Sequence, residues 1–105
     1  MATEPIQYTV FKAIRSTKGL RDSEKDILIA LYKRIISVGP IMSISAITAD
    51  LQYNHATVVR CLAIAKEKGF INYESCGWKN PFSKFSFTDK LHPRINEVFD
   101  ESYRH

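Results

Sequence analysis

The chain has 105 residues and a mass of 12.0 kDa, which is enough for one domain and not comfortably for two. Hydrophobic residues make up 45% and charged residues 25% of the sequence, which excludes a disordered or low-complexity chain. The formal charge of +4 is modest and is compatible with an anionic partner, so the placement of the charges matters more than their sum.

The basic excess is concentrated near the N-terminus. Residues 1–21 contain four basic residues and a single acid, whereas the rest of the chain is nearly balanced. The segment from Ser75 to Thr88 is a local exception, because it contains Lys79 and Lys84 and no acid. These two segments are where we expect contacts with a phosphate backbone.

Cysteine and histidine usage argues against a disulfide scaffold, a redox switch or a metal site. Cys61 and Cys76 do not belong to a CxxC pair, so inert thiols in a reduced, cytoplasmic compartment are expected. His55, His92 and His105 lack metal-ligand spacing. The sequence also lacks a nucleophile elbow, a glycine-rich phosphate loop and an apolar run of about 20 residues. We therefore expect no enzyme, cofactor, metal, small-molecule ligand or membrane span.

The first part of the chain is predicted to form a lead-in and a long helix. Residues 6–14 predict a short extended or helical segment that covers one edge of the core with Val10, Phe11 and Ile14. Ser23 followed by Asp26 predicts a capping box with an aspartate in the usual glutamate position. A helix follows and ends at Gly39-Pro40. Its apolar residues recur at helical spacing: Ile27, Leu28, Leu31, Ile35 and Ile36.

Two further helices are predicted, with a tight turn between them. A short helix over residues 46–51 places Ile47 and Leu51 one turn apart, and the two residues after it leave room only for a tight turn. Asn54 is a suitable N-cap for a third helix that ends at Gly69. The inward-facing positions of this helix are spaced i, i+4 and i+7: Val58, Leu62 and Ala65.

Two strands and a final helix are predicted after Gly69. Residues 70–74 are rich in β-branched and aromatic types, and residues 84–88 alternate strictly between polar and aromatic. The segment 76–83 contains Gly, Asn and Pro and is predicted to be a hairpin loop. Phe85 and Phe87 are expected in the core. Pro93 suits the first turn of a last helix.

This order of elements resembles a winged helix-turn-helix. The chain is similar to MarR-like winged-helix DNA-binding regulators over residues 45–71, SAITADLQYNHATVVRCLAIAKEKGFI, and residues 85–89 resemble the strand and threonine that close the wing. The lead-in FKAIRSTKGLRDSEKDILIAL is also similar to the start of winged-helix domains in plasmid and phage replication or partition proteins. The resemblance implies an α+β fold with a three-helix core, a β-hairpin wing and an extra C-terminal helix. The expected organisation is a basic lead-in over 1–21, the winged domain over 22–90 and a C-terminal helix over 91–105.

The resemblance implies double-stranded DNA as the partner, with the helix over about residues 55–68 in the major groove. A helix about 10 to 12 Å across fits a groove roughly 12 Å wide. The outward positions are His55, Ala56, Thr57, Val59, Arg60 and Ala63. Base contacts are expected mainly from His55, Thr57 and Arg60, with Arg60 pairing bidentately with guanine. Asn54 lies where many such helices meet a phosphate.

The predicted wing, residues 76–84, is expected to contact the flanking DNA backbone or minor groove through Lys79, Asn80 and Lys84. Trp78 either anchors the loop, packed back on its own strands, or lies against sugar edges. The packed arrangement is the one we favour from sequence.

The last helix carries an apolar stripe that either pairs two protomers or caps its own core. The stripe consists of Ile95, Val98, Phe99 and Tyr103. We expect a homodimer that binds a specific DNA site as a small transcriptional regulator, in the cytoplasm at the nucleoid. A plasmid or viral replication or partition factor is one alternative. The other is a protein-interaction module without DNA binding, favoured by the apolar residues Val59, Ala63 and Ile64 on the third helix.

Overall fold

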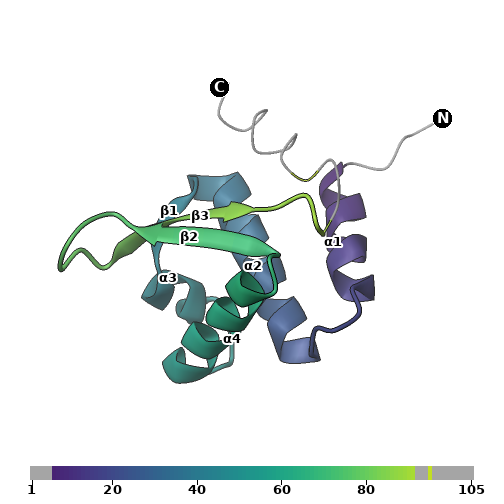
Figure 1. Cartoon of the computed structure of the whole chain (residues 1–105), viewed down its shortest axis with the longest axis horizontal. Helices are drawn as coiled ribbons and strands as arrows, with labels where there is room; N and C mark the ends of the chain where they lie inside the picture. Colours follow the sequence, from purple (N-terminus) through teal and green to yellow (C-terminus); the bar gives the residue numbers. More distant parts are fainter. Residues whose placement is uncertain (1–5, 92–94, 96–105) are drawn as a thin grey trace.

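Residues 6–91 and residue 95 are described in the computed structural model (Figure 1). They form a small α+β domain of four helices and a three-stranded antiparallel sheet, which confirms the predicted structural class. The elements in chain order are α1 (Ile6–Ser16), α2 (Asp22–Val38), β1 (Ile41–Ser43), α3 (Ile44–Ala49), α4 (His55–Glu67), β2 (Ile71–Ser75) and β3 (Phe82–Phe87).

The lead-in is the helix α1, and its predicted core contacts are confirmed. Val10 and Ile14 are fully buried, and the Phe11 ring meets the ring of Tyr32 on α2 edge to face, with 5.5 Å between centroids. This aromatic contact docks α1 against the middle of α2. Burial raises the pKa of Tyr32 to about 12.

The predicted start of α2 is wrong. The helix begins at Asp22 with Arg21 as its N-cap, and the carboxylate of Glu24 accepts a 3.4 Å hydrogen bond from the Arg21 backbone N–H. Asp26, the acid of the predicted capping box, instead forms a 2.9 Å ion pair with Arg15 and accepts a 2.8 Å hydrogen bond from the Tyr53 hydroxyl. Because Arg15 and Tyr53 bind the Asp26 carboxylate, Asp26 does not cap α2. Glu24, three residues after the N-cap Arg21, is the acid of the capping box instead.

Strand β1 is absent from the sequence-based prediction. It follows Gly39-Pro40 directly and pairs antiparallel with β3, so the strand order in the sheet is β1-β3-β2. The pairing places Ile41 opposite Lys84 and Ser43 opposite Phe82. Three residues are too few for an alternating pattern, so this strand exists because β3 supplies its hydrogen-bonding partners.

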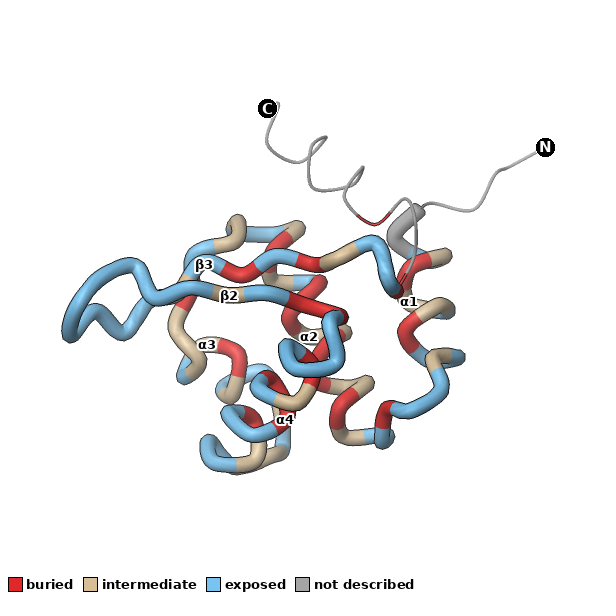
Figure 2. The backbone as a smooth tube through the Cα atoms, in the orientation of Figure 1, coloured by how far each residue is buried: buried red, intermediate tan, exposed pale blue. Residues whose placement is uncertain are grey.

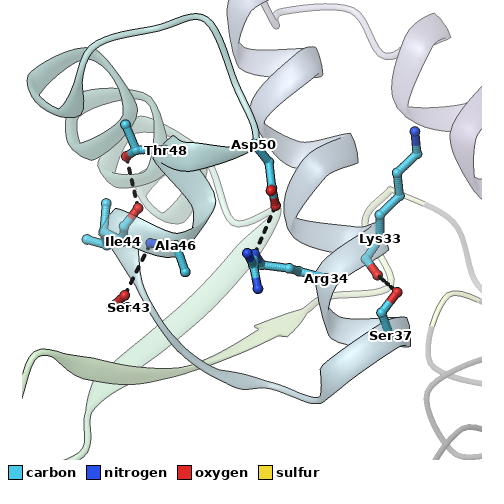
Figure 3. A network of polar contacts seen from close by, with 8 residues as sticks. All are labelled: Lys33, Arg34, Ser37, Ser43, Ile44, Ala46, Thr48 and Asp50. Carbon is cyan, nitrogen blue, oxygen red and sulfur yellow. Dashed lines mark hydrogen bonds and ion pairs between the residues drawn. The ribbon is translucent and has the colours of Figure 1, made fainter.

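Two helix caps hold the short helix α3 and the helix α4 in place. The Ser43 hydroxyl accepts a 3.2 Å hydrogen bond from the Ala46 N–H, and the Asn54 side chain accepts a 2.8 Å hydrogen bond from the Thr57 N–H. Helix α3 ends at Ala49, before the predicted residue 51. An ion pair of 2.9 Å between Arg34 on α2 and Asp50 ties the end of α3 to α2 (Figure 3).

The core lies between the sheet and the helices. Figure 2 shows that buried stretches of α1, α2, α4, β2 and β3 face the interior, while the loop between β2 and β3 is exposed. Phe85 and Phe87 are buried, as predicted. Ile95 is also fully buried, so this side chain of the predicted dimerisation stripe contributes to the core of its own chain. Val98, Phe99 and Tyr103 lie outside the described residues, and dimerisation stays a prediction.

Candidate nucleic-acid interface

Helix α4 has one buried and one exposed face. The predicted inward residues Val58, Leu62 and Ala65 are fully buried, and Cys61 joins them at 4% exposure. The outward prediction is confirmed for five of its six residues, which are exposed: His55, Ala56, Val59, Arg60 and Ala63. Thr57 is half-buried, because it lies in the first turn beside the Asn54 cap. The five exposed residues of the predicted set are thus one arginine, one histidine and three small apolar side chains, and Lys66 and Glu67 are exposed in the last turn of the same helix.

The N-terminal end of α4 is fixed by Asn54, as predicted. The side-chain oxygen of Asn54 already accepts the hydrogen bond from the Thr57 N–H, so the side-chain NH2 group of Asn54 is the part left to donate to a partner. The first backbone N–H groups of a helix also favour an anion nearby.

The C-terminal end of α4 is fixed by a left-handed glycine and by a lysine. Gly69 has φ +84°, and the Phe70 N–H donates a 3.0 Å hydrogen bond back to the Ala65 carbonyl, which ends the helix. The Lys68 ammonium lies 3.7 Å from the buried Glu24 carboxylate and also donates to the Gly19 carbonyl. These contacts join α4 to the beginning of α2 and to the α1–α2 connection.

The loop between β2 and β3, residues 76–81, protrudes from the sheet, and Trp78 is its most exposed large side chain. The favoured expectation that Trp78 packs back on its own strands is wrong, because 89% of its surface is exposed. The ammonium of Lys79 lies 4.4 Å from the centre of the Trp78 ring. The Asn80 side-chain oxygen accepts a 2.9 Å hydrogen bond from the Phe82 N–H, so Asn80 shapes the turn.

The remaining predicted wing residue, Lys84, is exposed on β3 and lies opposite Ile41 on one side and Glu74 on the other. The beginning of α4 and the loop between β2 and β3 lie toward the same end of the domain, and α1 lies at the other end (Figure 1). The elements that carry the predicted helix and loop residues thus lie toward the same end of the domain, away from α1.

The prediction from sequence missed a surface depression between α1, α2 and the α3–α4 connection. It has a volume of about 520 Å³ and is lined in part by Arg15, Asp26 and Tyr53. The hydrogen bond that Tyr53 donates to the Asp26 carboxylate raises the pKa of Tyr53. No local sequence pattern joins three residues from such distant positions, so nothing in the sequence alone pointed to this cluster.

Within residues 6–91 and 95, no group of three His, Cys, Asp or Glu side chains is arranged to hold a metal ion. Over the same residues, no helix has the length and apolar character needed to cross a membrane. No protein-family model matches the chain, and no curated protein matches its sequence. The class that the described residues define is thus a structural one: a small α+β domain with an exposed helix face beside a protruding hairpin.

Proposed function

We propose that this domain is a winged helix-turn-helix that binds double-stranded DNA at specific sites as a small transcriptional regulator at the nucleoid. In this proposal α4 enters the major groove and the loop between β2 and β3 contacts the adjacent backbone or minor groove. The element order supports the assignment, because α3 and α4 are joined by a short turn and β1 pairs with the outgoing hairpin strand β3.

The observation that carries the proposal is the exposed face of α4. A helix of 13 residues is about 20 Å long, and its diameter with side chains matches the width of the major groove. One face is fixed in the core by Val58, Leu62 and Ala65, so the opposite face is presented on a rigid support. Base contacts need such a support because they depend on precise placement of a few side chains.

The exposed residues suit different contacts. The Arg60 guanidinium can donate two parallel hydrogen bonds to O6 and N7 of guanine, and the small side chains Ala56 and Val59 fit beside a thymine methyl group. His55 and the Asn54 amide lie at the beginning of α4, where a phosphate is favoured. On the hairpin, Lys79 and Lys84 supply charge for the backbone.

A second function, a protein-interaction module, is favoured by the apolar part of the same face. Val59 is 38% exposed and Ala63 is exposed, so this face of α4 also offers apolar surface that a protein partner could cover. The two functions differ in what they predict for DNA retention at low salt, because a phosphate-binding surface gains affinity as salt falls.

Mobility-shift titrations test the proposal. The wild-type chain is titrated with a random-sequence duplex and with a duplex selected from a random pool, at several salt concentrations. Arg60→Ala is expected to weaken binding to the selected duplex by about 5- to 150-fold, with little change for the random duplex. Lys79→Ala is expected to weaken both and to reduce the salt slope by about 1.

The matched control is Lys33→Ala, which removes a positive charge on α2 that contacts the Phe11 ring and not the proposed interface. It is expected to bind both duplexes as the wild type does. If Arg60→Ala and Lys79→Ala also bind as the wild type does, the site is wrongly placed. If the wild type is not retained by any duplex at low salt, the protein-interaction function replaces the proposal.

A further inference from the structure

The loop between β2 and β3 presents an aromatic ring that the fold itself does not use. Trp78 is 89% exposed, whereas the other large exposed hydrophobic side chains in the described part of the chain range from 38% to 64%. A tryptophan in a protein core typically removes about 150 to 250 Å² from water. Trp78 contributes almost none of this area to folding, so its position at the tip suits a contact with a partner.

The ring is held on an ordered turn. The Asn80 N–H donates a 3.1 Å hydrogen bond to the Gly77 carbonyl, which closes a four-residue turn with Trp78 and Lys79 at its centre. Lys79 has φ +62°, the left-handed conformation that type II turns use at their third position. The Cys76 N–H donates a 3.0 Å hydrogen bond to the Phe82 carbonyl at the base of the loop. The backbone of the tip is thus closed by hydrogen bonds, and Trp78 projects from it with 89% of its surface exposed.

The surroundings of the ring favour a polyanion with flat apolar faces. The Lys79 ammonium lies 4.4 Å from the ring centre, and residues 76–81 of the loop contain no acid, whereas Lys84 on β3 lies opposite Glu74. A nucleobase offers a π-face to the indole, and the phosphate attached to it offers a negative charge to the lysine. An apolar protein pocket would match the ring but would not match the positive charge beside it.

We infer that Trp78 stacks on an exposed nucleobase face, so that the DNA bound by this domain includes an interruption in base stacking beside the hairpin. This inference rests on the proposed DNA binding and narrows its substrate class. Within an intact duplex both faces of every internal base are covered, so the indole needs a gap, an end or a base step that opens easily. Pyrimidine–purine steps such as TA are the easily opened steps, and A-tracts resist opening.

The test uses the fact that Trp78 is the only tryptophan in the chain, so selectively excited tryptophan emission reports on the hairpin tip alone. Three duplexes of equal length are compared: one with a short single-stranded gap, one fully paired with a central TA step, and one fully paired with a central A-tract. Stacking is expected to quench the Trp78 emission at least twofold and to protect it from acrylamide on the gapped duplex. The TA duplex is expected to give a smaller change and the A-tract duplex the smallest.

Affinity measurements on variants separate stacking from simple proximity. Trp78→Ala is expected to lose about 5- to 150-fold in affinity for the gapped duplex, the range that corresponds to ~1–3 kcal/mol of base–aromatic stacking, and to bind the A-tract duplex nearly as the wild type does. Trp78→Phe keeps an aromatic face and is expected to retain most of the preference for the gap. Both substitutions lie at an exposed tip, and unchanged thermal unfolding checks that the fold is intact.

The outcomes distinguish the inference from the proposed function. If the wild type binds all three duplexes equally and its emission stays unchanged, the stacking inference is overturned while DNA binding stands. If no duplex is bound at low salt, both are overturned. A blue shift of the emission that grows with protein concentration in the absence of DNA assigns the ring to contact between copies of the chain, and this also overturns the inference.

Discussion

The contact between Lys68 and Glu24 predicts an unusual order of mutational effects. The two charged atoms lie 3.7 Å apart, but the Glu24 side chain is only 4% exposed whereas that of Lys68 is 41% exposed. If the lysine is removed, the carboxylate is left in a place that water scarcely reaches. If the carboxylate is neutralised, the ammonium can turn into solvent. Lys68→Met is therefore expected to destabilise the domain more than Glu24→Gln.

The expected losses in the free energy of unfolding follow from this difference in exposure between Glu24 and Lys68. Breaking a fully buried ion pair from one side costs about 3 to 5 kcal/mol, and an exposed pair contributes roughly 0.2 to 1 kcal/mol. With one partner buried and one partly exposed, we expect about 2 to 3 kcal/mol for Lys68→Met and about 1 kcal/mol for Glu24→Gln. The double variant is expected to be more stable than Lys68→Met alone, because it no longer contains a buried carboxylate without a cationic partner.

Urea unfolding of the wild type, the two single variants and the double variant measures these free energies. Lys66→Met is the matched control, since the Lys66 ammonium contacts the Tyr73 carbonyl at 3.0 Å and the Tyr73 ring, without a carboxylate partner among these contacts. It is expected to cost less than ~1 kcal/mol. If Lys68→Met costs no more than Glu24→Gln, or if the double variant shows the simple sum of the two effects, the buried carboxylate of Glu24 does not depend on Lys68.

Three other outcomes are expected. Burial raises the pKa of Tyr32 from 10.0 to about 12, so the stability that the protonated Tyr32 hydroxyl contributes, at most ~3 kcal/mol, is complete below pH 10 and is lost as the pH rises to 12. The urea midpoint of Tyr32→Phe should therefore fall less between pH 10 and pH 12 than that of the wild type, and equal falls would contradict this. Asn54→Ala should cost about 1 kcal/mol, measured as a drop of roughly 4 to 8 °C in Tm, while Asn54→Asp keeps the acceptor for the Thr57 N–H and should retain most of the stability. A thiol reagent should modify the exposed Cys76 in the folded protein and the buried Cys61 only after unfolding; equal rates for both thiols would disprove the burial of Cys61.

The parts of the fold that could be predicted from sequence are those with short-range causes. Asn54 caps α4 through a hydrogen bond to a residue three positions away, and Gly69 ends the same helix through its own backbone conformation. The alternation of Phe85 and Phe87 likewise predicts their burial. Each of these depends on residues within one turn or one strand, so the local sequence contains the necessary information.

The parts that could not be predicted depend on distant partners. Strand β1 requires β3, which follows some forty positions later in the chain. The spacing from Ser23 to Asp26 predicts a capping box, but Asp26 bonds instead to Arg15 and Tyr53, which lie outside α2. The sequence favours Trp78 packed on its own strands, whereas its ring is 89% exposed at a turn closed between Gly77 and Asn80, and no local pattern distinguishes these two arrangements.

The measurement that tests the central proposal most directly is a titration of the isotope-labelled chain with duplex DNA, followed by backbone amide chemical shifts at low salt. If α4 and the hairpin bind DNA, the largest shift changes are expected over residues 54–63 and 76–84, with small changes in α1. Changes centred instead on the depression beside Arg15, Asp26 and Tyr53, or no changes at all, would contradict the proposed interface.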